Sequence, residues 1–277
     1  MKARPLRTPP PLGLRSCLLA VLALAAAAVQ AQEASVVRIA TNVERSYFPP
    51  AEAMLRKAYA TLGLQVEFAP WPLPRTQVEL RSGRVDAVAM RVEAYFEQTP
   101  FVRKVDVPLL NLHVYAYGRP PCPNALPAEE LAKHRISYQR GMIAAEVLVP
   151  EGARMPANTP SDAFLNLESG VADYALMLTT PWMVEVPVDT RQGTLCRVPT
   201  PLSRSTLFHG VHESHAAWVA PLEQALRGMR DRGEIQQAWA TYEREIAAQN
   251  TRLQAQPGRS LTLTPATPGS APARPPQ

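Results

Sequence analysis

Arg91 is the residue whose type and position most clearly suggest ligand chemistry. It lies just beyond the segment 85–89 (VDAVA), which has the pattern of a buried strand. Open α/β sheets bind ligands at the carboxyl ends of their strands, and a guanidinium there can hold a carboxylate through two parallel hydrogen bonds. An exposed or structurally paired arginine would fit the same position, so both interpretations stay open.

A loop and two aromatic residues are further candidates for a ligand site. Arg140, Gly141 and Met142 stand where a helix is expected to begin, and the backbone N–H groups at a helix start attract anions. We expect this loop as a whole to contact the ligand, more than the Arg140 side chain in particular. Tyr47 and Trp71 could form an aromatic wall, although core packing would explain both residues equally well.

Two weaker candidates follow from position alone. Thr179 lies just past another expected strand, and Arg75 stands at the start of an expected helix, where it could brace the fold instead. Asp86 and Asp173 occur at turns, where a short carboxylate commonly bonds to nearby backbone. We therefore expect these two aspartates to stabilise turns and not to contact ligand.

The sequence gives little support to an enzyme or a metal centre. His209, His212 and His215 have the spacing H-x-x-H-x-x-H, but they span the end of an expected strand and the start of an expected helix. No carboxylate-rich or cysteine framework completes a zinc site there, and we predict a solvated turn. Nucleophile-elbow, phosphate-loop and H-E-x-x-H motifs are absent from the sequence. We predict no metal, no cofactor and no catalytic residue.

The first residues predict export. Four basic residues precede an apolar run from Cys17 to Val29, which is too short for a bilayer span of about 20 residues. This order is typical of a cleaved signal peptide, here residues 1–31, with an uncleaved anchor as the alternative. We therefore expect a periplasmic protein.

The net charge comes from the two ends of the chain. The whole sequence has 29 basic and 24 acidic residues, whereas residues 32–250 have 22 and 24. No basic stripe remains in this body to suggest binding to nucleic acid. Residues 251–277 are rich in Pro, Ser, Thr and Ala and are predicted to be disordered.

The body begins with alternating strand and helix patterns. Strands are expected at 36–40, 64–68 and 85–89, with helices at 51–62 and 75–81 between them. Each helix is followed by a glycine that can end it. This alternation is typical of a mostly parallel sheet flanked by helices.

The same order then returns, with strands at 135–139 and 174–178 and helices at 142–148 and 163–168. Ser82-Gly83-x-x-Asp86-x-x-x-Met90 is repeated as Ser169-Gly170-x-x-Asp173-x-x-x-Met177. Chance could place Gly and Asp at both turns, but the shared context favours two similar lobes.

The chain is expected to cross between the lobes twice. The proline-rich segment 118–123 separates the two units, and a strand at 206–211 with helices at 216–230 and 234–247 would return to the first lobe. The predicted boundaries are 32–117 plus 204–250 for lobe 1 and 118–203 for lobe 2.

Cys122 and Cys196 would remain after export. An even pair in an oxidising compartment suggests a disulfide, with two unpaired thiols as the alternative. Two crossings between the lobes would bring both cysteines to the same waist.

From about Val36 to Tyr242 the sequence resembles family three of the bacterial extracellular solute-binding proteins. The segments that carry the resemblance are VVRIA, Tyr47-Phe48-Pro49-Pro50, LRSGRVDAVAMR, LNLESGVADYALM and LEQALRGMRDRGEIQQAWATY. The resemblance implies a two-lobed type II periplasmic-binding fold joined by a two-strand hinge. It also implies a monomer that binds a small solute between its lobes and docks on an ABC-type permease or a sensor protein.

One stretch departs from that family. Amino-acid-binding members commonly carry Thr-x-x-Arg and Phe-Ser-x-Pro-Tyr after the first-lobe strand, whereas residues 91–97 here read RVEAYFE and residues 100–103 read PFVR. We expect a small polar, anionic solute, of which an amino acid is one option. The alternatives are a receptor module for a sensor or cell-envelope partner, and a lyase or dehydratase using Glu93 and Glu97.

Overall fold

The computed structural model describes residues 36–42, 49–180 and 195–254. The predicted signal peptide, Tyr47 and most of the predicted tail lie outside these residues. None of the helices in the described ranges combines the length and apolar character needed to span a bilayer.

The first part of the described chain forms a parallel sheet with connecting helices. Its elements in chain order are β1 (Val36–Asn42), α2 (Pro49–Ala60), β2 (Gln65–Trp71), α3 (Leu73–Arg81), β3 (Ala87–Val92) and α4 (Glu93–Gln98). β1 pairs in parallel with both β2 and β3. Gly63 and Gly83 follow α2 and α3 with φ of 72° and 68°, a conformation that glycine adopts at little cost. These elements, with α7 and α8 below, are called the first lobe.

A second set of elements repeats this plan and is called the second lobe. Its strands are β5 (Ile136–Gln139), β6 (Arg154–Ala157) and β7 (Tyr174–Thr179), and β5 pairs in parallel with the other two. The helices are the 3-10 turns η2 (Ala128–Lys133) and η3 (Glu151–Ala153), and the α-helices α5 (Ile143–Leu148) and α6 (Pro160–Glu168).

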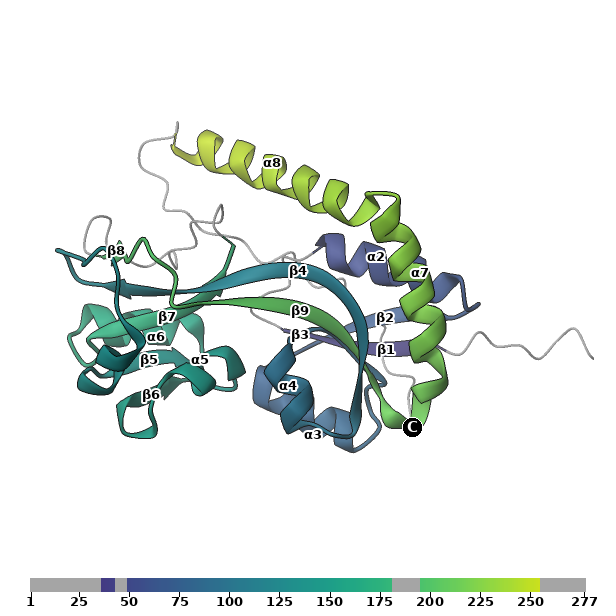
Figure 1. Cartoon of the computed structure of the whole chain (residues 1–277), viewed down its shortest axis with the longest axis horizontal. Helices are drawn as coiled ribbons and strands as arrows, with labels where there is room; N and C mark the ends of the chain where they lie inside the picture. Colours follow the sequence, from purple (N-terminus) through teal and green to yellow (C-terminus); the bar gives the residue numbers. More distant parts are fainter. Residues whose placement is uncertain (1–35, 43–48, 181–194, 255–277) are drawn as a thin grey trace, which may run out of the picture. The chain divides into compact units, whose positions relative to one another are not determined.

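Two long antiparallel strands join the lobes. β4 (Val102–Gly118) and β9 (Ser203–His212) pair along most of their length, and β8 (Cys196–Arg197) adds to the end of β4. The described strands form one nine-stranded sheet in the order β2-β1-β3-β9-β4-β7-β5-β6, with β8 beside β4. Figure 1 shows β4 and β9 running side by side from one lobe to the other.

The last helices pack against the first lobe. η4 (Glu213–Trp218) leads into α7 (Val219–Asp231) and α8 (Glu234–Gln254), and these two α-helices pack on each other and on α2 (Figure 1). The indole nitrogen of the buried Trp239 donates to the carbonyl oxygen of Leu109 at 2.7 Å. α8 continues past the predicted start of the tail at residue 251.

The two aspartates of the internal repeat make the same contacts in both lobes. The carboxylate of Asp86 accepts a hydrogen bond from the Arg38 backbone N–H at 2.8 Å, and that of Asp173 accepts from the Arg135 N–H at 2.8 Å. Each aspartate N–H donates in return to the carbonyl oxygen of the same arginine. Both aspartates therefore fix the start of a lobe's first strand, as expected of residues that stabilise turns.

The predicted disulfide is present. Cys122 and Cys196 are bonded, with their Cα atoms 5.9 Å apart. Because β8 pairs Cys196 with Gly118 at the end of β4, the disulfide joins the segment that enters the second lobe to the segment that leaves it.

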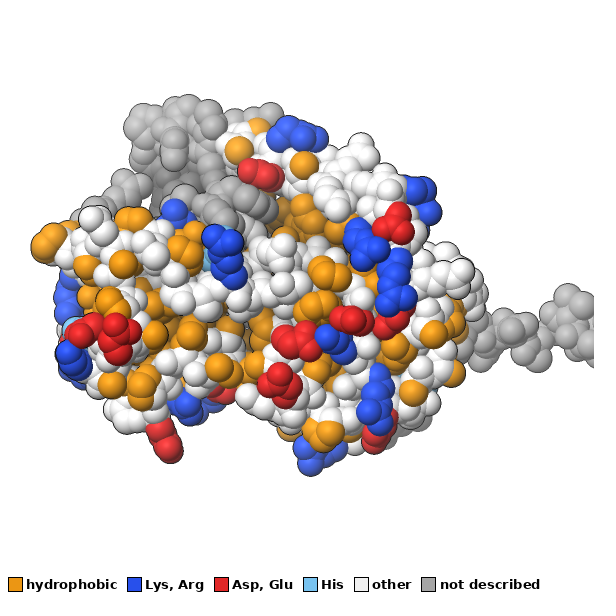
Figure 2. Space-filling model, in the orientation of Figure 1, with side chains coloured by type: hydrophobic (Ala, Val, Ile, Leu, Met, Phe, Trp, Pro, Cys, Tyr) orange, Lys and Arg blue, Asp and Glu red, His pale blue; other side chains and the backbone are white. Residues whose placement is uncertain are grey.

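On the visible face of the molecule, basic and acidic side chains are interspersed (Figure 2), in keeping with the near-neutral charge of the body.

Candidate functional site

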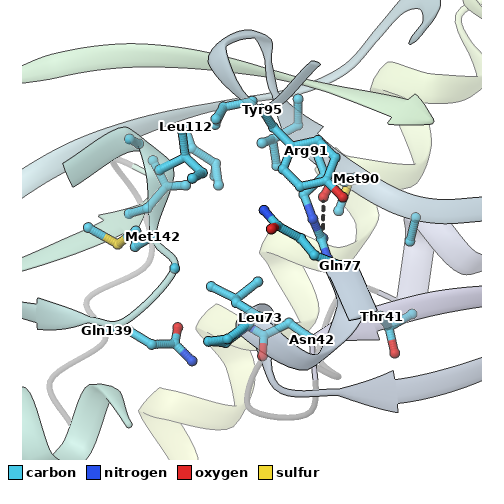
Figure 3. A pocket seen from close by; sticks show the side chains of 18 of the residues that line it. Thr41, Asn42, Leu73, Gln77, Met90, Arg91, Tyr95, Leu112, Gln139 and Met142 are labelled. Atoms are coloured by element: carbon cyan, nitrogen blue, oxygen red, sulfur yellow. Dashed lines mark hydrogen bonds between the residues drawn. The ribbon is translucent and has the colours of Figure 1, made fainter. Parts of the chain in front are cut away.

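A cavity of about 410 Å³ lies between the two lobes. Its first-lobe wall comes from the end of β1, the start of α3, β3 and α4, and its second-lobe wall from the end of β5 and the loop into α5 (Figure 3). The lining combines apolar side chains with ten polar ones, namely Thr41, Asn42, Glu52, Gln77, Arg91, Tyr95, Gln98, Gln139, Arg140 and Glu146. A cavity with apolar walls and placed polar groups is the usual form of a small-molecule site.

Arg91 lines this cavity but sits inside β3 and not beyond it. The strand continues to Val92, and its pairing with β9 shifts register between Val88 and Arg91. An irregularity of this kind bends a strand and can redirect a side chain. The sequence-based placement of Arg91 at the site is therefore compatible with the structure, whereas the predicted strand end at residue 89 was too early.

The guanidinium of Arg91 is buried. Nη1 donates to the carbonyl oxygen of Met90 at 2.8 Å, and the Tyr95 side chain lies close enough to hydrogen-bond with the guanidinium. No described carboxylate forms an ion pair with it. Burial lowers the pKa of Arg91, and the neighbouring Tyr95 side chain opposes part of that shift. An arginine remains protonated in proteins, so the cavity contains a desolvated positive charge.

The predicted loop in the second lobe also lines the cavity, but its N–H groups are already used. The N–H of Gly141 donates to the Glu146 carboxylate at 3.2 Å, and the N–H of Met142 donates to the carbonyl oxygen of Gln139 at 3.0 Å. The side chain of Arg140 is exposed and donates to the Pro156 carbonyl oxygen at 3.3 Å. This loop therefore offers shape and apolar surface more than free donors.

The lobes touch each other at this loop. Gly141 has φ of +79°, and a Cβ atom added there would lie 3.1 Å from Leu73 Cβ and 3.4 Å from Pro74 Cδ. α4 and α5 also contact each other across the cavity. Because Leu73 and Pro74 belong to α3 of the first lobe, a side chain at position 141 would press against that lobe.

The remaining predicted site residues lie elsewhere. The Arg75 guanidinium is 5.8 Å from the centre of the Trp71 ring and forms an ion pair with Glu79, and neither Trp71 nor Arg75 lines the cavity. Thr179 is buried at the end of β7 without lining the cavity, although the preceding Leu178 does. Tyr47 lies outside the described residues.

Of the polar residues that line the cavity, only Arg91 and Arg140 were predicted, and three of the others show why. Tyr95 comes from α4, Gln77 from α3 and Gln139 from the end of β5. The end-of-strand argument applied to Arg91 would also have selected Gln139. Gln77 and Tyr95 carry no comparable signal, because one lies within a helix and the other on a six-residue helix that was not predicted.

The histidine triplet is divided among three environments. His209 is fully buried in β9 and shares a hydrogen bond with the Tyr59 hydroxyl at 2.8 Å, so the prediction of a solvated turn is wrong for this residue. Burial lowers its pKa to about 4. His212 pairs with Ser214, whereas His215 stacks on Trp218 and bonds to Asp86 at 3.0 Å.

The two glutamates of the enzyme alternative do not line the cavity. Glu93 forms an ion pair with Lys104 at 2.7 Å, and Glu97 is exposed on α4. Within the described residues, no group of three or more His, Cys, Asp or Glu side chains could hold a metal ion.

Known proteins resemble this chain in structure but not detectably in sequence. No family model matches the chain, and no curated protein matches its sequence. A histidine kinase sensor domain with similarity to periplasmic binding proteins is 21% identical, with a TM-score of 0.62 over 75% of this chain and 96% of that one. An ancestral arginine-binding protein bound to arginine is 18% identical, with a TM-score of 0.60 over 75% and 97% of the two chains.

A third similar structure comes from Streptococcus pneumoniae. The amino acid ABC transporter substrate-binding protein AbpA, bound to L-arginine, is 15% identical with a TM-score of 0.59 over 76% of this chain and 94% of that one. At these identities the likeness concerns the fold. The predicted architecture, a mixed α/β fold with the two lobes of the periplasmic-binding proteins, is confirmed.

Proposed function

We propose that this chain, which has the fold of the periplasmic substrate-binding proteins, binds a small anionic solute between its lobes and delivers it to an ABC-type permease. The predicted ligand class is an amino acid or a related carboxylate. The observation that carries the proposal is the buried guanidinium of Arg91, which lines the cavity without a carboxylate partner in the described residues. A buried cation is costly unless it is paired, and an anionic solute would supply the pair.

The two-lobed architecture supports binding by closure. β4 and β9 connect the lobes, and two antiparallel hinge strands can bend without repacking either core. Gly141 and Leu73 meet when the lobes are together, so a solute that contacts both walls favours this state. Solved structures of the same fold have arginine or glutamine bound, which is what makes an amino acid one option.

Native mass spectrometry of the mature protein, purified gently from periplasm, tests the proposal. A stoichiometric extra mass, lost on denaturation and restored when the released compound is added back, is the expected result. Arg91→Ala should lose the compound, whereas Arg75→Ala, which removes an arginine that does not line the cavity, should retain it. A protein that purifies empty and that no solute in a broad panel stabilises would overturn the proposal. Turnover of the bound compound would favour the enzyme alternative instead.

A second candidate function is a receptor that reports its ligand to a sensor protein. It is favoured by one observation, the structural similarity to a histidine kinase sensor domain. Affinity capture from detergent-solubilised membranes, with and without the released compound, separates the two functions. Enrichment of permease subunits supports transport, whereas enrichment of a membrane kinase supports signalling. The same cell fractions test the predicted periplasmic location and the removal of residues 1–31.

A further inference from the structure

Four neighbouring strands each contribute one apolar side chain to the wall of the cavity. They are Val92 of β3, Leu207 of β9, Leu112 of β4 and Leu178 of β7. These strands lie side by side in the sheet in that order, from the first lobe across the two hinge strands to the second lobe. We call these four side chains the apolar floor of the cavity.

The strand register places the whole apolar floor on one face of the sheet. Leu207 pairs with Val92 on one side and, on the other, with the residue two positions before Leu112. Leu178 pairs with the residue two positions after Leu112. Directly opposed side chains of antiparallel strands share a face, as do side chains two residues apart on one strand. The four side chains therefore lie on the same side of the sheet and form one apolar surface.

The second-lobe wall adds further apolar surface. Residues 142–144, with the sequence Met-Ile-Ala, line the cavity, and Gln139 contributes a neutral amide. The charged residues of this wall, among those that the structure describes, are hydrogen-bonded within their own lobe. Glu146 accepts from the Gly141 N–H at 3.2 Å, and Arg140 donates to a carbonyl oxygen of β6 at 3.3 Å. This wall therefore suits an uncharged part of the solute.

An acid group alone would leave most of the cavity unfilled. At about 30 Å³ for each water molecule, the cavity of about 410 Å³ would hold roughly 14 waters. Apolar walls hold water poorly, so replacing it with hydrocarbon favours binding. A charged group in the same place would lose its hydration without gaining a partner. Figure 3 shows Leu112 and Met142 on the side of the cavity opposite Gln77, so an apolar wall faces a polar one.

We infer that the solute has, besides its acid group, an uncharged hydrocarbon body of several carbon atoms that lies against the apolar floor and the second-lobe wall. This inference rests on the proposed function and specifies the class of solute, namely aliphatic or aromatic carboxylates without a second charged group. Because Leu178 and residues 142–144 belong to the second lobe, the hydrocarbon body contacts both lobes at once and so favours the closed state.

The test compares four acids that share a carboxylate and differ in the rest of the molecule. Butanoate and hexanoate differ by two methylene groups. Adipate and aminocaproate are hexanoate with a terminal carboxylate and a terminal ammonium group, respectively. Dissociation constants come from NMR titration of protein freed of any copurified solute. Hexanoate should bind about fifteenfold more tightly than butanoate, since each buried methylene contributes about fourfold. Adipate and aminocaproate should bind at least roughly tenfold more weakly than hexanoate.

A polar substitution in the apolar floor tests where the hydrocarbon lies. Leu178→Asn should weaken hexanoate binding about tenfold and reduce the preference for hexanoate over aminocaproate. Leu165→Asn is the matched control, because Leu165 is a half-exposed leucine on α6 of the same lobe and does not line the cavity. The control should bind all four acids as wild type does. The wild-type series stands by itself if Leu178→Asn does not fold.

Several results would overturn the inference. One is hexanoate binding no more tightly than butanoate, and another is adipate binding as tightly as hexanoate. A third is tight binding of aminocaproate that Glu52→Gln abolishes, which would mean that the cavity holds a cationic group at Glu52. In each of these cases an acid still binds, so the proposed function stands while the inference fails. Failure of all four acids to bind a protein that also purifies empty would overturn both.

Discussion

The two copies of the Ser-Gly-x-x-Asp-x-x-x-Met segment share a backbone but present different side chains to the cavity. In both copies the glycine has positive φ, and the aspartate ties the turn to the first strand of its lobe. The residue after the methionine lines the cavity in each case, as Arg91 in the first lobe and Leu178 in the second. Equivalent positions therefore supply a charge on one wall and an apolar surface on the other.

This difference suggests that the two lobes have different roles in binding. The first lobe contributes the buried cation and its neighbour Tyr95, while the second contributes Leu178 and a loop whose N–H groups are used internally. We expect the first lobe to determine the affinity for an acid group, and the second lobe to determine whether the cavity closes over the rest of the solute. Changes in the two lobes should then have separable effects.

Making the two copies of the repeated segment alike at the cavity should have the largest effect on solute affinity. Arg91→Leu gives the first lobe the residue that the second lobe has, and it removes charge-assisted hydrogen bonds worth about 3 kcal/mol, or at least roughly a hundredfold in affinity. Isothermal titration calorimetry with the compound released from wild-type protein measures this. Leu178→Met, a conservative change at the equivalent position, should alter the affinity by less than about threefold. Similar affinities for Arg91→Leu and wild type would refute the idea that the first lobe determines the affinity for an acid group.

A buried histidine distinguishes the core of the first lobe and should make the protein sensitive to acid. The pKa of His209 in the folded protein is about 4, below the ordinary value of 6.5, because burial disfavours its charged form. The stability that depends on a neutral His209 is therefore complete above about pH 6.5 and is lost as the pH falls toward 4, by up to roughly 3 kcal/mol.

Urea unfolding near neutral pH and near pH 4.5 measures this loss. His209→Gln keeps a polar partner for Tyr59 but does not titrate, so its free energy of unfolding should fall less over the same range. Hydrogen exchange should show the acid-induced opening first in β9 and α2, which meet at this histidine. An identical pH dependence in the variant would contradict this assignment.

Much of the fold could be predicted because its signals are local. Helix-ending glycines at positions 63, 83, 170 and 233 all have positive φ in the structure. The helix expected at 163–168 begins earlier, at Pro160, because Thr159 accepts a hydrogen bond from the Asp162 N–H and caps it. Errors of this kind shift a boundary and leave the topology intact.

The longest strand was missed because its pattern is interrupted. β4 contains Pro108, which lies where the pairing with β9 shifts register between Val105 and Leu110. Proline cannot donate to a ladder and is confined to edges and bulges, so a proline within a segment does not indicate a central strand. The bulge that accommodates it depends on β9, which is far away in the sequence.

The site was harder to predict than the fold. Arg91 and the loop at 140–142 line the cavity, whereas Trp71 and Arg75 contact each other outside it. An arginine over an aromatic ring can belong to a binding site or to a lobe's surface, and the residue types do not decide between them. Tyr95 lies on α4, a helix of six residues without a side-chain cap, which is too short to give a clear pattern in the sequence.

The contact between the lobes gives a smaller effect that separates closure from stability. Gly141→Ala should weaken solute binding about tenfold, because the added methyl group meets Leu73 at 3.1 Å and holds the lobes apart. Gly170→Ala is a matched control with φ of +77° in the same lobe and its nearest neighbour 3.9 Å away. Both variants should lose about 1 kcal/mol of stability from the backbone conformation. Weakened binding in Gly170→Ala as well would show that backbone strain, and not closure, is responsible.

The smallest expected effect concerns the repeated aspartates. Asp86→Ala and Asp173→Ala each remove an acceptor for one backbone N–H, and each should cost about 1 kcal/mol in the free energy of unfolding at neutral pH.

The effect of Asp173 should also depend on pH, because hydrogen bonding from Arg135 lowers the pKa of Asp173. Its contribution is therefore present above the ordinary carboxyl pKa of 3.8 and is lost as the pH falls through the lower folded value. Denaturant titration of Asp173→Ala and wild type at neutral and strongly acid pH should show the two proteins converging in acid, and a difference that persists there would mean that the carboxylate charge contributes nothing.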